Sequence, residues 1–411
     1  MRQQRWIFVA AAVIVAGNAW ADHSFSIRSV GRHLLEAVVG CPFCSAPSLT
    51  MAEQLAQSDA ILLVKWTGGK PATGSDGGTT EFEILDIVRQ PMSGGLKRGG
   101  TISLVRYRAA KTGTLFALLG TKAGATIDWG SPIEVTSDSF AYMKNAPAPD
   151  VEPRKRLKFF LQHLDSADPM ISADAYGEFA NAQYADIAAI APQFPREKLQ
   201  KWVADPNVSP SRLGLYGLML GLCGQDDDAQ VLEKKVLETS GEFRVGIDGV
   251  MGGYLLLTRD AGLKKLEQAM IVNKKAQFSD TYATMQALRF MWQYGDDRIS
   301  KDRLRQSMRL LLERPELADM VIADLARWQD WSVQGRLMEL YGAEEYDIPS
   351  IKRAIVRYML ASTKDGAKPV EEGSAPAEPP PHVLQGQKYL AELEQKDPKT
   401  VADAKRFYFI K

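Results

Sequence analysis

The segment Leu215-Tyr216-Gly217-Leu218-Met219-Leu220 begins a series of apolar helical segments that decides the fold of most of this chain. Similar segments follow at intervals of roughly 33 to 37 residues, the length of one helical pair in a repeat array. Each helical pair in such an array buries its apolar face against its neighbours. The sequence therefore predicts an α-helical solenoid over residues 152–362, and an irregular all-helical domain is the alternative. The later segments are residues 250–255, 287–292, 321–326 and 354–359, and residues 173–180 fit an earlier unit.

The period and pattern of these segments resemble those of HEAT and armadillo-type repeats. The resemblance covers about residues 152–362, and these families lack an invariant signature that could be matched residue by residue. It implies stacked helical pairs that present an extended surface to another protein.

The sequence between residues 60 and 135 has the pattern of short β-strands. Residues 60–66 form a compact apolar run, and residues 81–88 alternate at first and then slip by one position, as a bulged strand does. Further strands are expected at residues 101–107, 114–119 and 133–135. Five strands broken by Gly-rich turns predict a small barrel or sandwich. The expected fold class is therefore α+β and multidomain, with a small all-β barrel in a module over residues 22–146 followed by the solenoid.

The order of segments in this module resembles the OB-type barrel of the netrin and metalloproteinase-inhibitor (TIMP-like) family. The resemblance covers about residues 41–140 and implies that the module inhibits a protease. Inhibitory members of that family chelate the protease metal through the free amine of a leading Cys. Here Cys41 lies about twenty residues inside the mature end expected at Asp22, so this chemistry needs a second cleavage. The segments that carry the resemblance, after the Cys pair, are Ser58-Asp59-Ala60-Ile61-Leu62-Leu63-Val64-Lys65, Phe82-Glu83-Ile84 and Gly99-Gly100-Thr101-Ile102-Ser103-Leu104.

The first residues have the layout of a secretory signal peptide. Arg2 and Arg5 precede an apolar run at residues 6–17, and Ala19-Trp20-Ala21 is a small-x-small cleavage site. We expect residues 1–21 to be removed and the chain to be exported to the periplasm, the cell surface or the medium, as in an exported bacterial protein. The run is short for a bilayer span, so we expect no stable membrane span after cleavage.

The balance of basic and acidic residues limits the classes of molecule that the chain can bind. The 411 residues contain 50 Lys and Arg against 50 Asp and Glu, without basic runs. Nucleic acid and anionic lipid both require clustered cations, so we exclude both as partners. The expected partner is another exported or cell-envelope protein.

The cysteines supply one compact motif, Cys41-Pro42-Phe43-Cys44. A local disulfide is expected in an oxidising compartment. The alternative is a thiol–disulfide oxidoreductase that uses Cys41 and Cys44, which requires a depressed pKa at a helix N-terminus. Cys223 lies in an apolar helix and is interpreted as a buried free thiol. The four histidines are scattered, so we expect no metal site and no cofactor.

Arg and Trp recur at related places in two units of the repeat region. Both residue types often anchor protein interfaces, and a ladder of them on successive helices would line a groove. The competing interpretation is that the Trp residues belong to the core and that the Arg residues pair with Asp324 or Asp330. The candidate binding residues are Arg289, Trp292, Arg327, Trp328 and Trp331.

Residues 363–381 contain five prolines and predict a flexible linker. A helical tail follows at residues 382–411, expected either to dock on the body or to bind a partner from a tether. Taken together, the sequence favours a non-enzymatic protein-binding scaffold, with the oxidoreductase and the protease inhibitor as alternatives.

Overall fold

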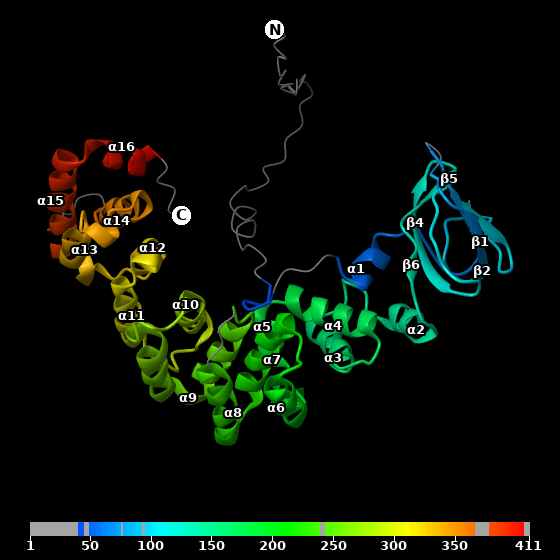
Figure 1. Ribbon diagram of the computed structural model, residues 1–411, viewed down its shortest axis with the longest axis horizontal. Helices are drawn as coiled ribbons and strands as arrows, with labels where there is room; N and C mark the ends of the chain where they lie inside the picture. Colours follow the sequence, from blue (N-terminus) through cyan, green and yellow to red (C-terminus); the bar gives the residue numbers. More distant parts are fainter. Residues whose placement is uncertain are drawn as a thin grey trace, which may run out of the picture. The chain divides into compact units, whose positions relative to one another are not determined.

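The structure is a computed structural model that describes residues 40–44, 49–74, 77–92, 95–238, 243–365 and 378–406. The expected signal peptide, most of the linker and the apolar end at residues 407–410 lie outside the described residues. The first part of the described chain forms one antiparallel sheet, and the rest is helical (Figure 1). The fold class is therefore α+β, as the sequence predicts.

The sheet has six strands in the order β3-β2-β1-β4-β5, with the short β6 also paired to β4. The pairing of β1 with β2 contains irregularities, and one of them skips Leu85, where the sequence pattern slips. The predicted bulge is thus present. The strands are β1 (Ala60–Lys70), β2 (Thr79–Arg89), β3 (Thr101–Leu104), β4 (Leu115–Ala123), β5 (Thr126–Trp129) and β6 (Ile133–Glu134).

The expected barrel is wrong, because the sheet is open. Its edge strands β3 and β5 have only four residues each and do not pair with each other. No backbone hydrogen bonds join β3 to β5 among the described residues. Instead, the Arg106 guanidinium donates hydrogen bonds to the carbonyl oxygens of Trp129 and Gly130. One face of the sheet encloses a small core around Phe82 and Phe116, whose rings meet edge to face at 5.5 Å between centroids.

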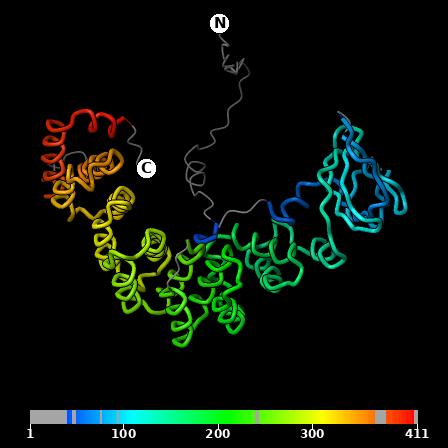
Figure 2. The backbone as a smooth tube through the Cα atoms, in the orientation of Figure 1, coloured from blue at the N-terminus to red at the C-terminus, as the bar shows by residue number. Residues whose placement is uncertain are grey.

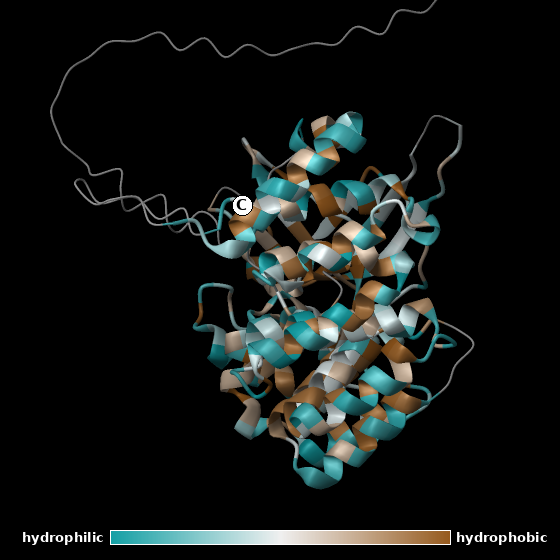
Figure 3. Ribbon diagram, turned by 90° about the vertical axis from the view of Figure 1, so that its left-hand side faces the viewer, coloured by the Kyte–Doolittle hydropathy of each residue, from teal (hydrophilic) through white to brown (hydrophobic). Residues whose placement is uncertain are grey.

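The helices follow in sequence order, and most neighbours along the chain pack together (Figures 1 and 2). Short 3-10 turns and a π-helical turn at Glu267–Val272 join some of them. Most carry both hydrophobic and hydrophilic residues, as expected of helices with one buried face (Figure 3). Their bounds are α1 (Met51–Ala56), α2 (Ser137–Asn145), α3 (Pro153–Leu161), α4 (Pro169–Asn181), α5 (Tyr184–Ala189), α6 (Arg196–Ala204), α7 (Pro210–Cys223), α8 (Asp226–Leu237), α9 (Ile247–Leu266), α10 (Phe278–Tyr294), α11 (Lys301–Leu310), α12 (Ala318–Arg327), α13 (Gln334–Leu340), α14 (Pro349–Ser362), α15 (Pro381–Lys396) and α16 (Pro398–Arg406).

Proline and capping residues fix where many helices begin. Proline occupies the first turn of α3, α4, α7, α14 and α15, where its missing N–H has no helical partner to lose. Thr50 caps α1 and forms a reciprocal capping box with Glu53. The tail helices α15 and α16 pack against α14 and place Leu393 and Val401 in the main core.

Buried ion pairs join residues one repeat length apart. Arg196 bonds to Asp228, 32 residues on, and Arg289 bonds to Asp324, 35 residues on. Arg244 with Asp280 and Glu267 with Arg303 are both 36 residues apart. These separations match the sequence period, so each carboxylate receives its arginine from the neighbouring unit. The helical part is therefore repeat-like.

Glycines allow α7 and α9 to touch backbone to backbone. A Cβ added at Gly253 would lie 2.0 Å from the Gly217 carbonyl oxygen, and one at Gly249 would lie 2.3 Å from the Gly214 carbonyl oxygen. Real side chains never approach so closely, which means that only glycine fits these positions. The backbones of α7 and α9 are therefore in direct contact.

The cysteine loop docks on the helices. Cys41 and Cys44 form the predicted disulfide, and the Cys41 N–H donates to the Ala180 carbonyl at the end of α4 at 2.9 Å. The Phe43 ring packs on Phe290 at 4.8 Å between centroids and on the bare backbone of Gly252. The loop therefore ties the chain before α1 to helices α4, α9 and α10.

A buried carboxyl cluster joins α1 to α4. Asp174 accepts hydrogen bonds from the Met51 N–H at 2.7 Å and from the Tyr142 hydroxyl at 2.7 Å. One turn later, Glu178 forms a salt bridge with the Arg156 guanidinium. Burial raises the pKa of Glu178 to about 7, although Thr50 and Arg156 favour its ionised form, while the nearby Asp174 and Glu53 add to the increase.

Gly253→Ala should lower the free energy of unfolding by about 1–3 kcal/mol, because its methyl group must displace α7. The matched control is Gly335→Ala at an exposed position of α13, where the nearest atom lies 3.8 Å from the added Cβ. That change should be neutral or stabilising by up to about 1 kcal/mol. Equal effects of the two substitutions in urea unfolding would contradict the packing argument.

Glu178→Gln should flatten the pH dependence of stability in weak acid. Between pH 4.5, its ordinary pKa, and about 7, folded Glu178 keeps a proton that the unfolded chain has lost. The free energy of unfolding therefore falls as pH rises through this window, and glutamine removes that contribution. Urea unfolding at pH 5, 6 and 7.5 measures the slope. Glu394→Gln, at an exposed pair with Lys405, should keep it, and an unchanged slope in Glu178→Gln would refute the assignment.

Candidate functional site

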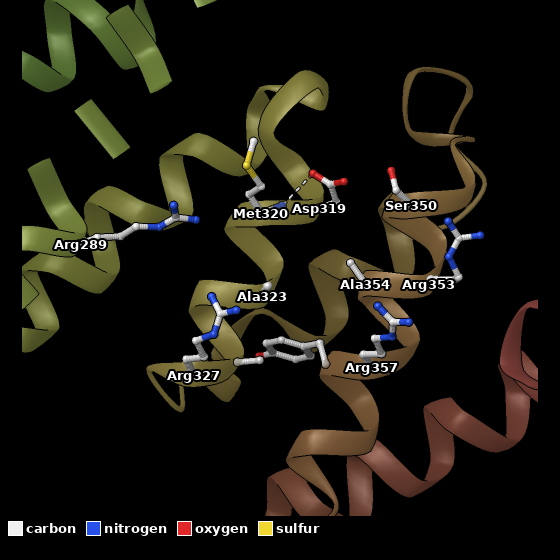
Figure 4. A pocket seen from close by; sticks show the side chains of 11 residues that line it. Arg289, Asp319, Met320, Ala323, Arg327, Ser350, Arg353, Ala354 and Arg357 are labelled. Carbon is white, nitrogen blue, oxygen red and sulfur yellow. Dashed lines mark hydrogen bonds between the residues drawn. The ribbon is translucent and has the colours of Figure 1, made fainter. Parts of the chain in front are cut away.

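A pocket of about 400 Å³ lies between α12 and α14, which carry the apolar segments of two successive units. Four arginines line it: Arg289 from α10, Arg327 from α12, and Arg353 and Arg357 from α14 (Figure 4). We call it the arginine pocket. The rest of its lining consists of three alanines with Asp319, Met320, Ser350 and Tyr358.

Local sequence explains the shape of this site. Arg353 and Arg357 are four residues apart, so they project from one face of α14, one turn from each other. Small residues, Ala323 on α12 and Ala354 on α14, stand where larger side chains would fill the space between the helices. Asp319 lies in the first turn of α12 and accepts a hydrogen bond from the Met320 N–H at 2.8 Å.

Two of the four arginines share one buried carboxylate. Asp324 is 3% exposed, and it accepts hydrogen bonds from Arg289 Nε at 2.6 Å and from Arg327 Nη1 at 2.9 Å. Arg289 therefore has a structural partner, which is the pairing that the sequence offered as an alternative to a groove. The Arg327 side chain remains 64% exposed.

The other two arginines have no such partner. Among the residues that the structure describes, neither Arg353 nor Arg357 has an ion pair or a hydrogen bond to another side chain, and the buried Nε of Arg357 has no acceptor at all. An unsatisfied buried donor costs about 1–3 kcal/mol, and more when the group is charged. An anionic ligand would supply the missing acceptors.

The predicted tryptophans lie beside the pocket rather than in its lining. The Trp292 and Trp328 rings stack at 4.2 Å between centroids with 5° between their planes. Lys301 lies over the Trp292 ring at 4.5 Å and Arg305 at 5.3 Å, and both cations also donate to tryptophan carbonyl oxygens. The stack thus joins consecutive units by packing and cation–π contacts.

Trp331 is engaged in the C-terminal contact. Its indole N–H donates to Asp365, and its ring stacks on His382, near the start of α15, at 5.9 Å. His382 Nε2 lies 3.1 Å from the same Asp365 carboxylate. The structure therefore brings Arg289 and Arg327 into one site and gives Trp292, Trp328 and Trp331 packing contacts.

Sequence reasoning missed Arg353 and Arg357. The signal was present, because α14 reads Pro-Ser-Ile-Lys-Arg-Ala-Ile-Val-Arg-Tyr-Met-Leu-Ala-Ser and contains three cations without an acid. A helix of this kind cannot neutralise its own charge through i,i+4 pairs.

The cysteines have the environment of structural groups. Cys41 is 5% exposed within the main core, and among the described residues the next helix, α1, begins at Met51. Burial raises the pKa of the Cys223 thiol to about 11, which suppresses its thiolate. The Cys41 N–H that a TIMP-like inhibitor would need as a free amine is the one that bonds to Ala180.

Within the described residues, no group of three or more histidine, cysteine or carboxylate side chains could hold a metal ion. The described helices are also too short or too polar to cross a membrane. Comparison of the chain with protein-family models, curated proteins and solved structures finds no match.

Truncation of two neighbouring residues should destabilise the chain to very different extents. Trp328→Ala removes a 5% exposed ring from the stack and should destabilise the chain by about 3–5 kcal/mol. Arg327→Ala removes an exposed side chain with one hydrogen bond and should cost about 1 kcal/mol or less. Thermal or urea unfolding measures both, and a small loss for Trp328→Ala would favour the groove interpretation of this residue.

Proposed function

We propose that the mature chain is an exported, non-enzymatic binding protein that holds another exported or cell-envelope protein on its helical repeat units. In this proposal the repeats form a HEAT-like α-solenoid. The signal-peptide layout of residues 1–21 supports export.

One observation carries the proposal: a pocket of about 400 Å³ lies between equivalent helices of successive units, α12 and α14. Arrays of repeats recognise partners through surfaces built from several units, because each unit contributes the same helix to one side. The pocket offers guanidinium groups and methyl groups, and its lining contains neither histidine nor cysteine. Guanidinium and methyl groups bind a partner through hydrogen bonds and apolar contact.

A thiol–disulfide oxidoreductase is the competing class. Its residues, Cys41 and Cys44, form a disulfide in a loop held by Ala180 and Phe290. The two functions can be separated, because a binding protein should keep its partner after the thiols are removed.

Photo-cross-linking in the cells that produce the chain tests the proposal. With the photoreactive residue p-benzoylphenylalanine in place of Ser350, at the pocket, we expect a covalent adduct with one protein. The same residue in place of Lys388, exposed on α15, should give none. A Cys41→Ser, Cys44→Ser variant with an unchanged circular dichroism spectrum should keep the adduct.

The captured protein must then bind the purified mature chain directly. Equal adducts from both positions, or no adduct from Ser350, would contradict the proposed function. Loss of the adduct in the folded double Cys variant would favour the oxidoreductase.

A further inference from the structure

We propose that the arginine pocket binds two carboxylate groups of an acidic segment in the partner protein. This inference rests on the proposed function and names the chemistry that the partner presents. It follows from the charge of the pocket, from the placement of its arginines and from its walls.

The net positive charge of the arginine pocket favours a ligand with two negative groups. Its lining holds four arginines against one aspartate, and Asp324 beneath it pairs with Arg289 and Arg327. The remaining excess is two positive charges, carried in effect by Arg353 and Arg357. A ligand with two carboxylates neutralises this excess.

The placement of the two free arginines points to one bound segment. Like charges four residues apart on a helix repel each other, so Arg353 and Arg357 destabilise α14 slightly until an anion lies between them. The buried, unsatisfied Nε of Arg357 needs an acceptor that the described protein does not provide. The planar guanidinium fork matches a carboxylate with two parallel hydrogen bonds.

The walls of the pocket favour a peptide over a small inorganic anion. A volume of about 400 Å³ is within the range of organic ligand sites. Met320 and the alanines give methyl and thioether surface between the arginines. The methylene groups of glutamate side chains would cover this surface, whereas a phosphate ion would leave it exposed to water.

The ends of the pocket differ, which orients the segment. Asp319 and Ser350 lie at the end where α12 and α14 begin, and Arg327 and Arg357 lie further along these helices (Figure 4). Asp319 repels a carboxylate placed beside it. The acidic side chains therefore enter at the end that holds Arg327 and Arg357.

Fluorescence anisotropy of a labelled hexaglutamate peptide with the full mature chain tests the inference. The Arg353→Gln, Arg357→Gln variant should bind at least about tenfold more weakly, because it loses two charge-assisted contacts. Neither residue has a described structural partner, so the variant should unfold at the urea concentration of the parent. The matched control is Lys352→Gln, which removes a cation from the same helix at a position that pairs with Asp347 outside the pocket. It should change affinity less than about twofold.

Further outcomes decide between ligand classes. Hexaglutamine should not bind, and affinity for hexaglutamate should fall between 50 and 200 mM salt. Tighter binding of inorganic phosphate than of hexaglutamate, or an arginine variant that binds like the parent, would overturn the inference. If hexaglutamate fails while the Ser350 cross-link persists, this inference fails and the proposed function stands. If arginine-dependent peptide binding occurs without a cross-linked partner, the pocket chemistry stands and the proposed function fails.

Discussion

The arrangement of the helical units depends on carboxylates that are buried and therefore must be paired. The side chain of Asp228 is fully buried, and that of Asp324 is 4% exposed. A carboxylate in such a place is expensive unless a cation reaches it. In each case the cation is an arginine from the adjacent unit, about one repeat length away in sequence. These pairs add little net stability compared with apolar residues, but they penalise any stacking that separates them. The sequence period is thereby converted into a fixed register between units.

The need to pair buried carboxylates explains which arginines have a structural role. Arg196, Arg244, Arg289 and Arg303 each bond to an acid of a neighbouring unit. The unit that contains α14 is followed by α15 and α16, which pack against α14 and place Leu393 and Val401 in the main core. The Tyr341 hydroxyl at the end of α13 also donates a hydrogen bond to Asp397. No described acid of these helices reaches Arg353 or Arg357. The free charge of the arginine pocket is thus the consequence of a pairing pattern that stops at α14.

Much of the helical part could be predicted because its signals are local. The apolar period and the prolines at helix starts are both visible in the sequence. Strand β5 and helix α2 were missed, although Gly124 at φ 62° marks the turn before β5 and a Thr136–Ser139 capping box opens α2. Barrel closure could not be judged, because it depends on whether two distant edge strands meet. The sequence identified Arg289 and Arg327 from their tryptophan neighbours, but it could not reveal that Asp324 holds both.

The contrast between Arg289 and Arg357 shows how a structural and a ligand-binding arginine can be distinguished on equivalent helices. Arg289 donates to Asp324 and Gln286, so its charge is satisfied before any ligand arrives. When the apolar segments 321–326 and 354–359 are aligned, Arg357 occupies the position that Asp324 occupies in the preceding unit, so a cation stands in place of an acid. A cation at that position, with a buried Nε and no acceptor among the described residues, is unfavourable for folding alone. Residues whose local environment is unfavourable for folding tend to lie at functional sites, because the local loss has to be offset by something outside the fold. For this pocket, the group that offsets the loss is an anion.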